Sequence, residues 1–112
     1  MVKLKYFKDS EIFGLEENLV FRLDKARECS GIPFIITSGL RSIEKNKEIG
    51  GVDNSAHLKG LAVDIRCLND SQKYAIIGGA IMAGFERIGI GKNHIHLDID
   101  KSKPYRVIFI EE

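Results

Sequence analysis

The chain has 112 residues, of which 44% are hydrophobic and 29% are charged, a composition typical of one globular domain spanning residues 1–112. Its 17 basic and 16 acidic residues nearly balance, which argues against nucleic acid as the main partner, and no apolar run approaches the length of a membrane span. The N-terminus lacks the apolar stretch of a signal peptide, so we expect synthesis in the cytoplasm and action outside only after release.

Hydrophobic periodicity predicts two main helices, one shorter helix and several short strands. Apolar residues recur at helical spacing from Leu15 to Cys29, and Gly31 and Pro33 follow them as helix-ending residues. A second main helix is predicted through residue 83 with Asp70 or Ser71 as its cap, and a short helix over 42–48 with Ser42 as its capping start. Strands are predicted over 34–37, 61–65, 85–90, 94–99 and 106–110.

This order of elements predicts an α+β fold rather than a doubly wound sheet, because helices come first and antiparallel-type strands dominate the end. We expect a small antiparallel sheet with the two main helices packed on it, in a monomeric protein. The Gly78-Gly79 pair costs stability inside the second main helix, and close packing against the sheet would explain it. Cys29 and Cys67 are expected to be separate reduced thiols rather than a disulfide.

All three histidines of the chain lie in two short segments, S-A-H-L-K-G-L-A-V-D at 55–64 and N-H-I-H-L-D at 93–98. His57 and Asp64 are too far apart to bind one ion if the segment is straight, since seven strand residues span more than ~20 Å. Gly60 removes the difficulty because it allows a turn, after which Asp64 lies on the returning strand.

The H-x-H segment places its polar side chains on one face of a predicted strand. His94, His96 and Asp98 alternate with apolar residues, so all three point the same way. A lone H-x-H is more often a pair of surface histidines, but together with the first segment it favours a metal site. Two nitrogens and one oxygen suit zinc, and three protein ligands leave a position open, as in catalytic rather than structural zinc sites.

These motifs resemble one family of enzymes. The pattern S-x-H-x-x-G-x-A-x-D at 55–64, followed by H-x-H, resembles the zinc D-Ala-D-Ala carboxypeptidases and the related phage L-alanyl-D-glutamate endopeptidases. The segments I-T-S-G-L-R-S at 36–42, G-G-V-D-N-S at 50–55 and G-F-E-R-I-G at 84–89 resemble further elements of this family in the same order. The resemblance covers roughly residues 15–98 and implies the fold shared by D,D-peptidases and Hedgehog domains.

The resemblance also implies roles for individual residues. The zinc ligands fall on His57, Asp64 and His96. Arg41 falls on the arginine that binds the substrate's carbonyl or carboxylate and helps to stabilise an oxyanion, and Ser55 on a serine beside the substrate backbone. The implied substrate is the stem peptide of peptidoglycan, with a D-amino acid near the bond that is cut. A phage or prophage lysis or virion protein fits this interpretation.

One position departs from the family pattern. Many members carry a carboxylate base three residues before the last zinc histidine, and here that residue is Asn93, whose amide cannot accept a proton from water. His94 is the first candidate for the missing base, and Asp98 is the second, although orienting a zinc histidine suits Asp98 better. The alternative hypothesis is a module that binds zinc and cell-wall peptide with little or no catalysis, as in Hedgehog domains.

Overall fold

The computed structural model describes residues 4–52 and 55–111, so Asp53 and Asn54 of the G-G-V-D-N-S run lie outside the described residues. The helices are α1 (Glu17–Ser30), α2 (Ile43–Glu48) and α3 (Asp70–Met82). The strands are β1 (Ile36–Ser38), β2 (Ala62–Arg66), β3 (Arg87–Ile90), β4 (His94–Asp98) and β5 (Val107–Ile110). Within these residues there are also two short 3-10 segments, η1 (Asp9–Glu11) and η2 (Ala56–Lys59).

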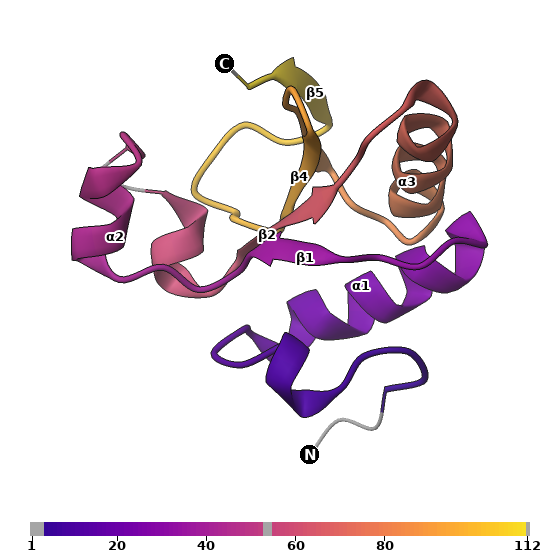
Figure 1. The fold of residues 1–112 in the computed structure, drawn as a ribbon, viewed down its shortest axis with the longest axis horizontal. Coiled ribbons are helices and arrows are strands. Elements are labelled where there is room, and N and C mark those ends of the chain that lie inside the picture. Colours follow the sequence, from indigo (N-terminus) through magenta and orange to yellow (C-terminus); the bar gives the residue numbers. More distant parts are fainter. Residues whose placement is uncertain (1–3, 53–54, 112) are drawn as a thin grey trace.

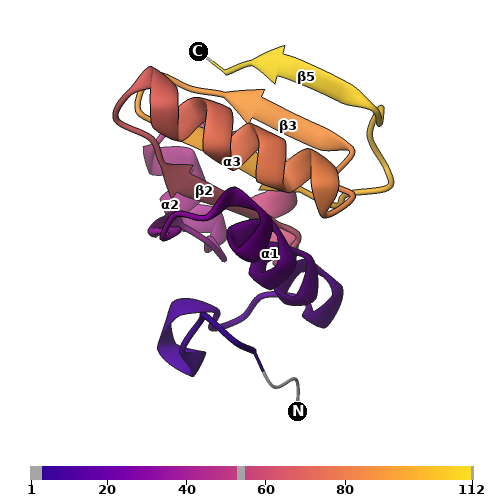
Figure 2. The same cartoon turned by 90° about the vertical axis from the view of Figure 1, so that its right-hand side faces the viewer.

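The five strands form one sheet in the order β1-β2-β4-β3-β5. All neighbouring strands are antiparallel except β3 and β5, which are parallel. Helices α1 and α3 pack together on one face of the sheet, and α2 lies on the other side (Figures 1 and 2). Within the described residues, no helix is long and apolar enough to cross a membrane.

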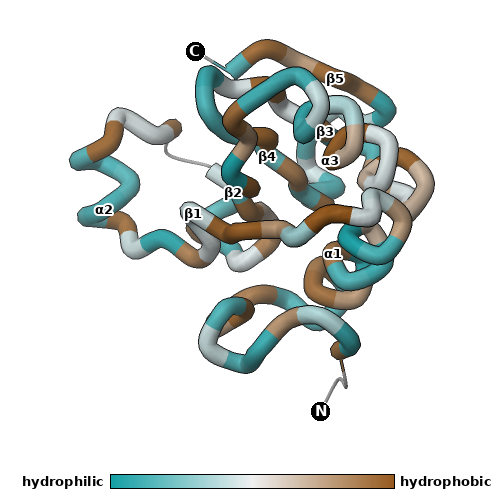
Figure 3. Tube along the Cα trace, turned by 45° about the vertical axis from the view of Figure 1, so that its right-hand side comes forward, coloured by the Kyte–Doolittle hydropathy of each residue, from teal (hydrophilic) through white to brown (hydrophobic). Residues whose placement is uncertain are grey.

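The alternation of side chains along each strand divides the sheet into a core face and an open face. Val63 and Ile65 of β2, with Ile95 and Leu97 of β4, are completely buried in the cluster that also contains the inner residues of α1 and α3. The residues between them point to the opposite face. In Figure 3, β2 and β4 accordingly mix hydrophobic and hydrophilic segments, whereas α2 is mostly hydrophilic.

The α+β class and the two main helices packed on a sheet are confirmed, with two differences in detail. The sheet is antiparallel as expected except at β5, which pairs in parallel with β3 because the connection over 99–106 carries the chain across β3 before it pairs. The cap of α3 is Asn69, whose side chain accepts a hydrogen bond from the Gln72 N–H, and not Asp70 or Ser71. The predicted cap of α2 is correct, since Ser42 accepts from the Lys45 N–H.

The glycine pair in α3 has a different explanation from the expected packing on the sheet. Gly79 lies against α1, where an added Cβ would come within 2.4 Å of the Ala26 carbonyl oxygen and 2.9 Å of Ser30. A Cβ on Gly78 would meet nothing within 4 Å. Only Gly79 is therefore required, because it allows the two helices to approach closely.

This contrast gives a matched pair of variants for the helix contact. Gly79→Ala should destabilise the protein by about 1–3 kcal/mol, because the added methyl group overpacks the contact with α1. Gly78→Ala should stabilise it by about 0.5–1 kcal/mol, because alanine loses less backbone entropy in a helix. Urea unfolding followed by circular dichroism measures both. Equal effects of the two substitutions would contradict the packing described for Gly79.

Candidate metal centre

The polar residues of the open face line up across the strands. The register pairs Asp64 with Ser38 on one side and with His96 on the other, and His96 with Gly89. Gly89 in turn pairs with Phe109 of β5. A Cβ on Gly89 would lie 2.7 Å from the Phe109 ring and 3.1 Å from the His96 Cβ, so a glycine is needed where these two side chains converge.

The turn that carries His57 brings it close to these polar residues of the open face. Ser55 begins η2, and its Oγ accepts a hydrogen bond from the His57 N–H. Gly60 ends the turn with a positive φ of 72°, and a Cβ there would lie 2.5 Å from the Gly14 carbonyl oxygen. The chain then returns along β2 to Asp64. The predicted turn at Gly60 is confirmed.

His57, Asp64 and His96 meet at this place, and all three are buried. Their potential ligand atoms all lie within 4.8 Å of one another. The Asp64 Oδ1 is 3.3 Å from His57 Nε2 and 3.2 Å from His96 Nδ1. Two ring nitrogens therefore converge on one carboxylate oxygen, which is an arrangement that a tetrahedral zinc ion can use.

The state of His57 tests whether these residues fit a metal ion. Its Nδ1 must donate to the Gly39 carbonyl oxygen 2.9 Å away, because a carbonyl only accepts. In the neutral ring, Nε2 then carries a lone pair that faces the Asp64 carboxylate. Among the described residues, His57 Nε2 is a buried polar side-chain atom with no hydrogen-bond partner. A cation between the two groups would satisfy both, so the donor set fits zinc.

His96 is held between two carboxylates. Its Nε2 donates to Asp98 Oδ2 at 2.6 Å, while its Nδ1 faces Asp64. Burial alone would lower the pKa of His96, but the hydrogen bonds to Asp64 and Asp98 raise that pKa to about 9. Without metal the ring is therefore protonated on both nitrogens at neutral pH, and a metal ion would replace the Nδ1 proton.

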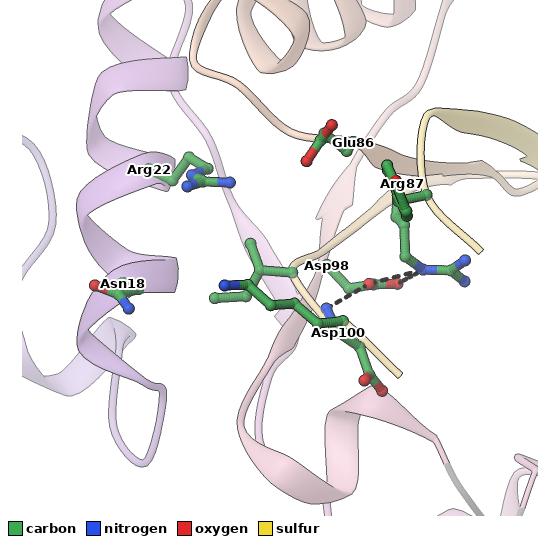
Figure 4. Close-up of a pocket in the computed structure, with 9 residues that line it drawn as sticks. Asn18, Arg22, Glu86, Arg87, Asp98 and Asp100 are labelled. Carbon is green, nitrogen blue, oxygen red and sulfur yellow. Dashed lines mark hydrogen bonds and ion pairs between the residues drawn. The ribbon is translucent and has the colours of Figure 1, made fainter. Parts of the chain in front are cut away.

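Both carboxylate oxygens of Asp98 accept hydrogen bonds. The Arg87 Nε donates to its Oδ1 at 2.9 Å, and the Asp100 N–H donates to the same oxygen at 3.0 Å. Figure 4 shows both interactions, with Asn18 and Arg22 across a cavity of about 310 Å³ that Arg87 and Asp98 also line. A fully buried carboxylate paired in this way orients the His96 ring, which is the role that suits Asp98 better than proton transfer.

Arg41 lies at the edge of the cluster and points into it. Its Nη2 is 3.5 Å from Asp64 Oδ2, the oxygen that does not face the histidines. Its Nη1 donates to the Oδ1 of Asn46, a buried residue whose amide also donates to the Val52 carbonyl. Arg41, Val52 and Ser55 line a groove of about 480 Å³ that contains the cluster.

Asn46, Arg87 and Glu111 were not found from the sequence as residues of the site. Asn46 lies on a short polar helix, where one amide among charged residues gives no signal. Glu111 follows β5, and its carboxylate contacts both His94 and His96. Of the positions discussed for the base, His94 lies in the groove on the same face as His96, as expected, whereas Asn93 is exposed in the turn before β4.

The comparisons with known proteins agree with this geometry. The model of the peptidase M15 family matches residues 7–98. This chain belongs to the peptidase M15 family. Members of the M15 family are zinc-dependent metallopeptidases, so the chain is a metallopeptidase family member with a candidate His/Asp metal site.

A solved structure supports the fold of this M15 peptidase. The crystal structure of the Serratia marcescens L-Ala D-Glu endopeptidase ChiX matches with a TM-score of 0.60 and 24% sequence identity. The match covers 82% of this chain and 85% of that chain. A search of curated proteins gave no match.

Asp100 ties the end of β4 to the turn that carries His57. It is buried and accepts from Lys59 Nζ at 3.0 Å, from the Ser102 N–H at 3.0 Å and from Ser102 Oγ at 2.6 Å. Burial alone would raise the pKa of Asp100, but these hydrogen bonds and the nearby Lys103 hold it well below its usual range. The ionised carboxylate therefore stabilises the folded protein.

Asp100→Asn should lower the free energy of unfolding by about 2 kcal/mol at pH 7, the scale of hydrogen bonds to a charged group. A carboxyl group whose pKa is lower in the folded than in the unfolded protein stabilises the fold at pH values above its unfolded pKa of ~3.9. This stabilisation is lost as the pH falls below that value. The difference between wild type and variant should thus shrink below about pH 4 in urea unfolding. Glu48→Gln, which removes an exposed carboxylate, is the control. A difference that stays constant down to about pH 2.5 would contradict the assignment.

Proposed function

We propose that this M15 peptidase is a zinc-dependent hydrolase of peptide bonds that involve D-amino acids in peptidoglycan stem peptides. The observation that carries the proposal is the cluster of His57, Asp64 and His96 inside a groove, with the Arg41 guanidinium at its edge. Three protein donors leave a metal ion open to water and substrate, as catalysis requires. ChiX, which shares the fold, is an L-Ala D-Glu endopeptidase, and a bond beside a D-amino acid is the kind proposed for this chain.

Each residue of the groove has a distinct part in this proposal. His57, Asp64 and His96 would hold the zinc ion, and the ion supplies a polarised water molecule and a polarised carbonyl. Arg41 would bind the substrate's carbonyl or carboxylate oxygen, because Ser38 and Asn46 hold its guanidinium toward the groove. Asp98, itself held by Arg87, fixes His96 in the tautomer that leaves Nδ1 for the metal.

Ser55 has a structural part as well as the proposed one. It caps η2 and so holds the His57 backbone, and it lines the groove where a substrate backbone would lie. We further propose that the protein meets its substrate after release to the cell wall, in keeping with a phage or prophage lysis or virion role.

The test is digestion of purified peptidoglycan and soluble stem pentapeptides by the zinc-loaded protein, with products identified by mass spectrometry. New termini at L-Ala and D-Glu indicate an endopeptidase, and loss of the terminal D-Ala indicates a carboxypeptidase. Arg41→Ala should lower kcat/KM about 10²–10³-fold, as loss of one oxyanion donor does, with the zinc content unchanged. Lys25→Ala, which removes an exposed cation on α1, is the control and should leave kcat/KM unchanged.

The outcomes separate the enzyme from the binding module. Hydrolysis that stops when a chelator removes zinc supports the proposed function. One equivalent of bound zinc, with binding of the stem peptide but no cleavage of any bond, would support the binding module instead. Hydrolysis that is insensitive to both chelator and Arg41→Ala would contradict the assigned site.

A further inference from the structure

The last strand brings a carboxylate to the site that the sequence pattern did not reveal. Alternation along β5 turns Val107 and Phe109 toward the open face, and Glu111 continues this alternation. Ile108 and Ile110 point the other way and are exposed at the sheet's edge. The Glu111 N–H donates to the Ile90 carbonyl oxygen at 2.9 Å, so the parallel pairing with β3 holds the backbone of Glu111.

Both oxygens of the Glu111 carboxylate face the groove. Its Oε1 accepts a hydrogen bond from His94 Nε2, and its Oε2 lies 3.4 Å from His96 Nδ1. The latter nitrogen is the atom that also faces Asp64. The Glu111 side chain remains 33% exposed, which leaves it open to water and to a substrate in the groove. A buried structural carboxylate such as Asp98 has no such access.

His94 is less suited to take a proton than Glu111. Its ring lies over Gly91, where an added Cβ would come within 2.1 Å of Cε1 and 2.6 Å of Nδ1. Its Nε2 faces the site, 4.0 Å from Asp64 Oδ1, but the N–H of this nitrogen donates a hydrogen bond to Glu111. At Nε2, His94 therefore orients the carboxylate and offers no free lone pair to the site.

We propose that Glu111 is the catalytic carboxylate of this enzyme, in place of the acidic residue expected at Asn93, and that His94 is its positioning residue. The proposal rests on the peptidase function proposed above. An O–H bond of the attacking water breaks and its proton goes to Glu111. The water oxygen bonds to the scissile carbonyl carbon, and the π electron pair of the C=O bond moves onto the carbonyl oxygen. The C=O bond then re-forms as the C–N bond breaks, the nitrogen keeps the electron pair of that bond, and the same proton passes from Glu111 to the leaving amine nitrogen.

Glu111→Gln tests this directly because it keeps the size and a hydrogen-bond acceptor for His94 while removing the proton acceptor. We expect kcat on a stem peptide to fall at least about 10²-fold, the usual loss for a general base. Zinc affinity, measured by competition with a chelator, should stay within about threefold, and the visible spectrum of the cobalt-substituted protein should not change. Glu28→Gln, a carboxylate on α1 paired with Lys5, is the control.

His94→Gln separates the two roles. The glutamine amide can still donate to Glu111 but cannot accept a proton, so kcat should remain within about tenfold of wild type. A loss as large as that of Glu111→Gln would make His94 the base and overturn the proposal. A Glu111→Gln protein that keeps its kcat, or one that loses zinc affinity more than about tenfold, would also overturn it, the second result making Glu111 a metal ligand.

Failure of the two proposals can be told apart. If the wild-type protein cleaves no stem peptide, the peptidase function and the role of Glu111 are both wrong. If the wild-type and Glu28→Gln proteins cleave and Glu111→Gln cleaves equally well, only the role of Glu111 is wrong.

Discussion

The site depends on the contacts that the buried carboxylate of Asp64 makes. One of its oxygens faces two histidines from distant parts of the chain, and the other faces Arg41. Burial alone would raise the pKa of Asp64, yet the proximity of His57 and His96 holds it well below its usual range, so the group is charged at neutral pH. A buried negative charge of this kind needs positive charge beside it, which either protonated histidines or a metal ion can supply.

Much of the fold follows from local sequence signals. The helical spacing of α1, the turn at Gly60 and the alternation of β4 are properties of neighbouring residues, and all three were predicted correctly. The parallel pairing of β5 was not predicted, because the direction of a last strand depends on where a connection crosses the sheet. The reason for Gly79 was also missed, since only the tertiary structure shows that α1 passes beside it.

The same difference between local signals and tertiary structure applies to the residues of the site. Histidines are rare enough here that their spacing pointed to the place where His57, Asp64 and His96 do meet. Glutamates are common on surfaces, so Glu111 near the end of the chain carried no signal until β5 was seen to run beside β3. The sequence could show that a carboxylate was missing at Asn93, but only the fold shows which other strand ends at the same groove.

The most direct test of this account is a crystal structure of the zinc-loaded protein with anomalous data at the zinc edge. The expected result is one peak bound by His57 Nε2, the Asp64 carboxylate and His96 Nδ1, with Asp98 still hydrogen-bonded to His96 and a coordination position open to the groove. A second set of donors, formed by Asp64, His94 and Glu111, lies beside the first. A zinc peak on that set, or no zinc at either, would contradict the account.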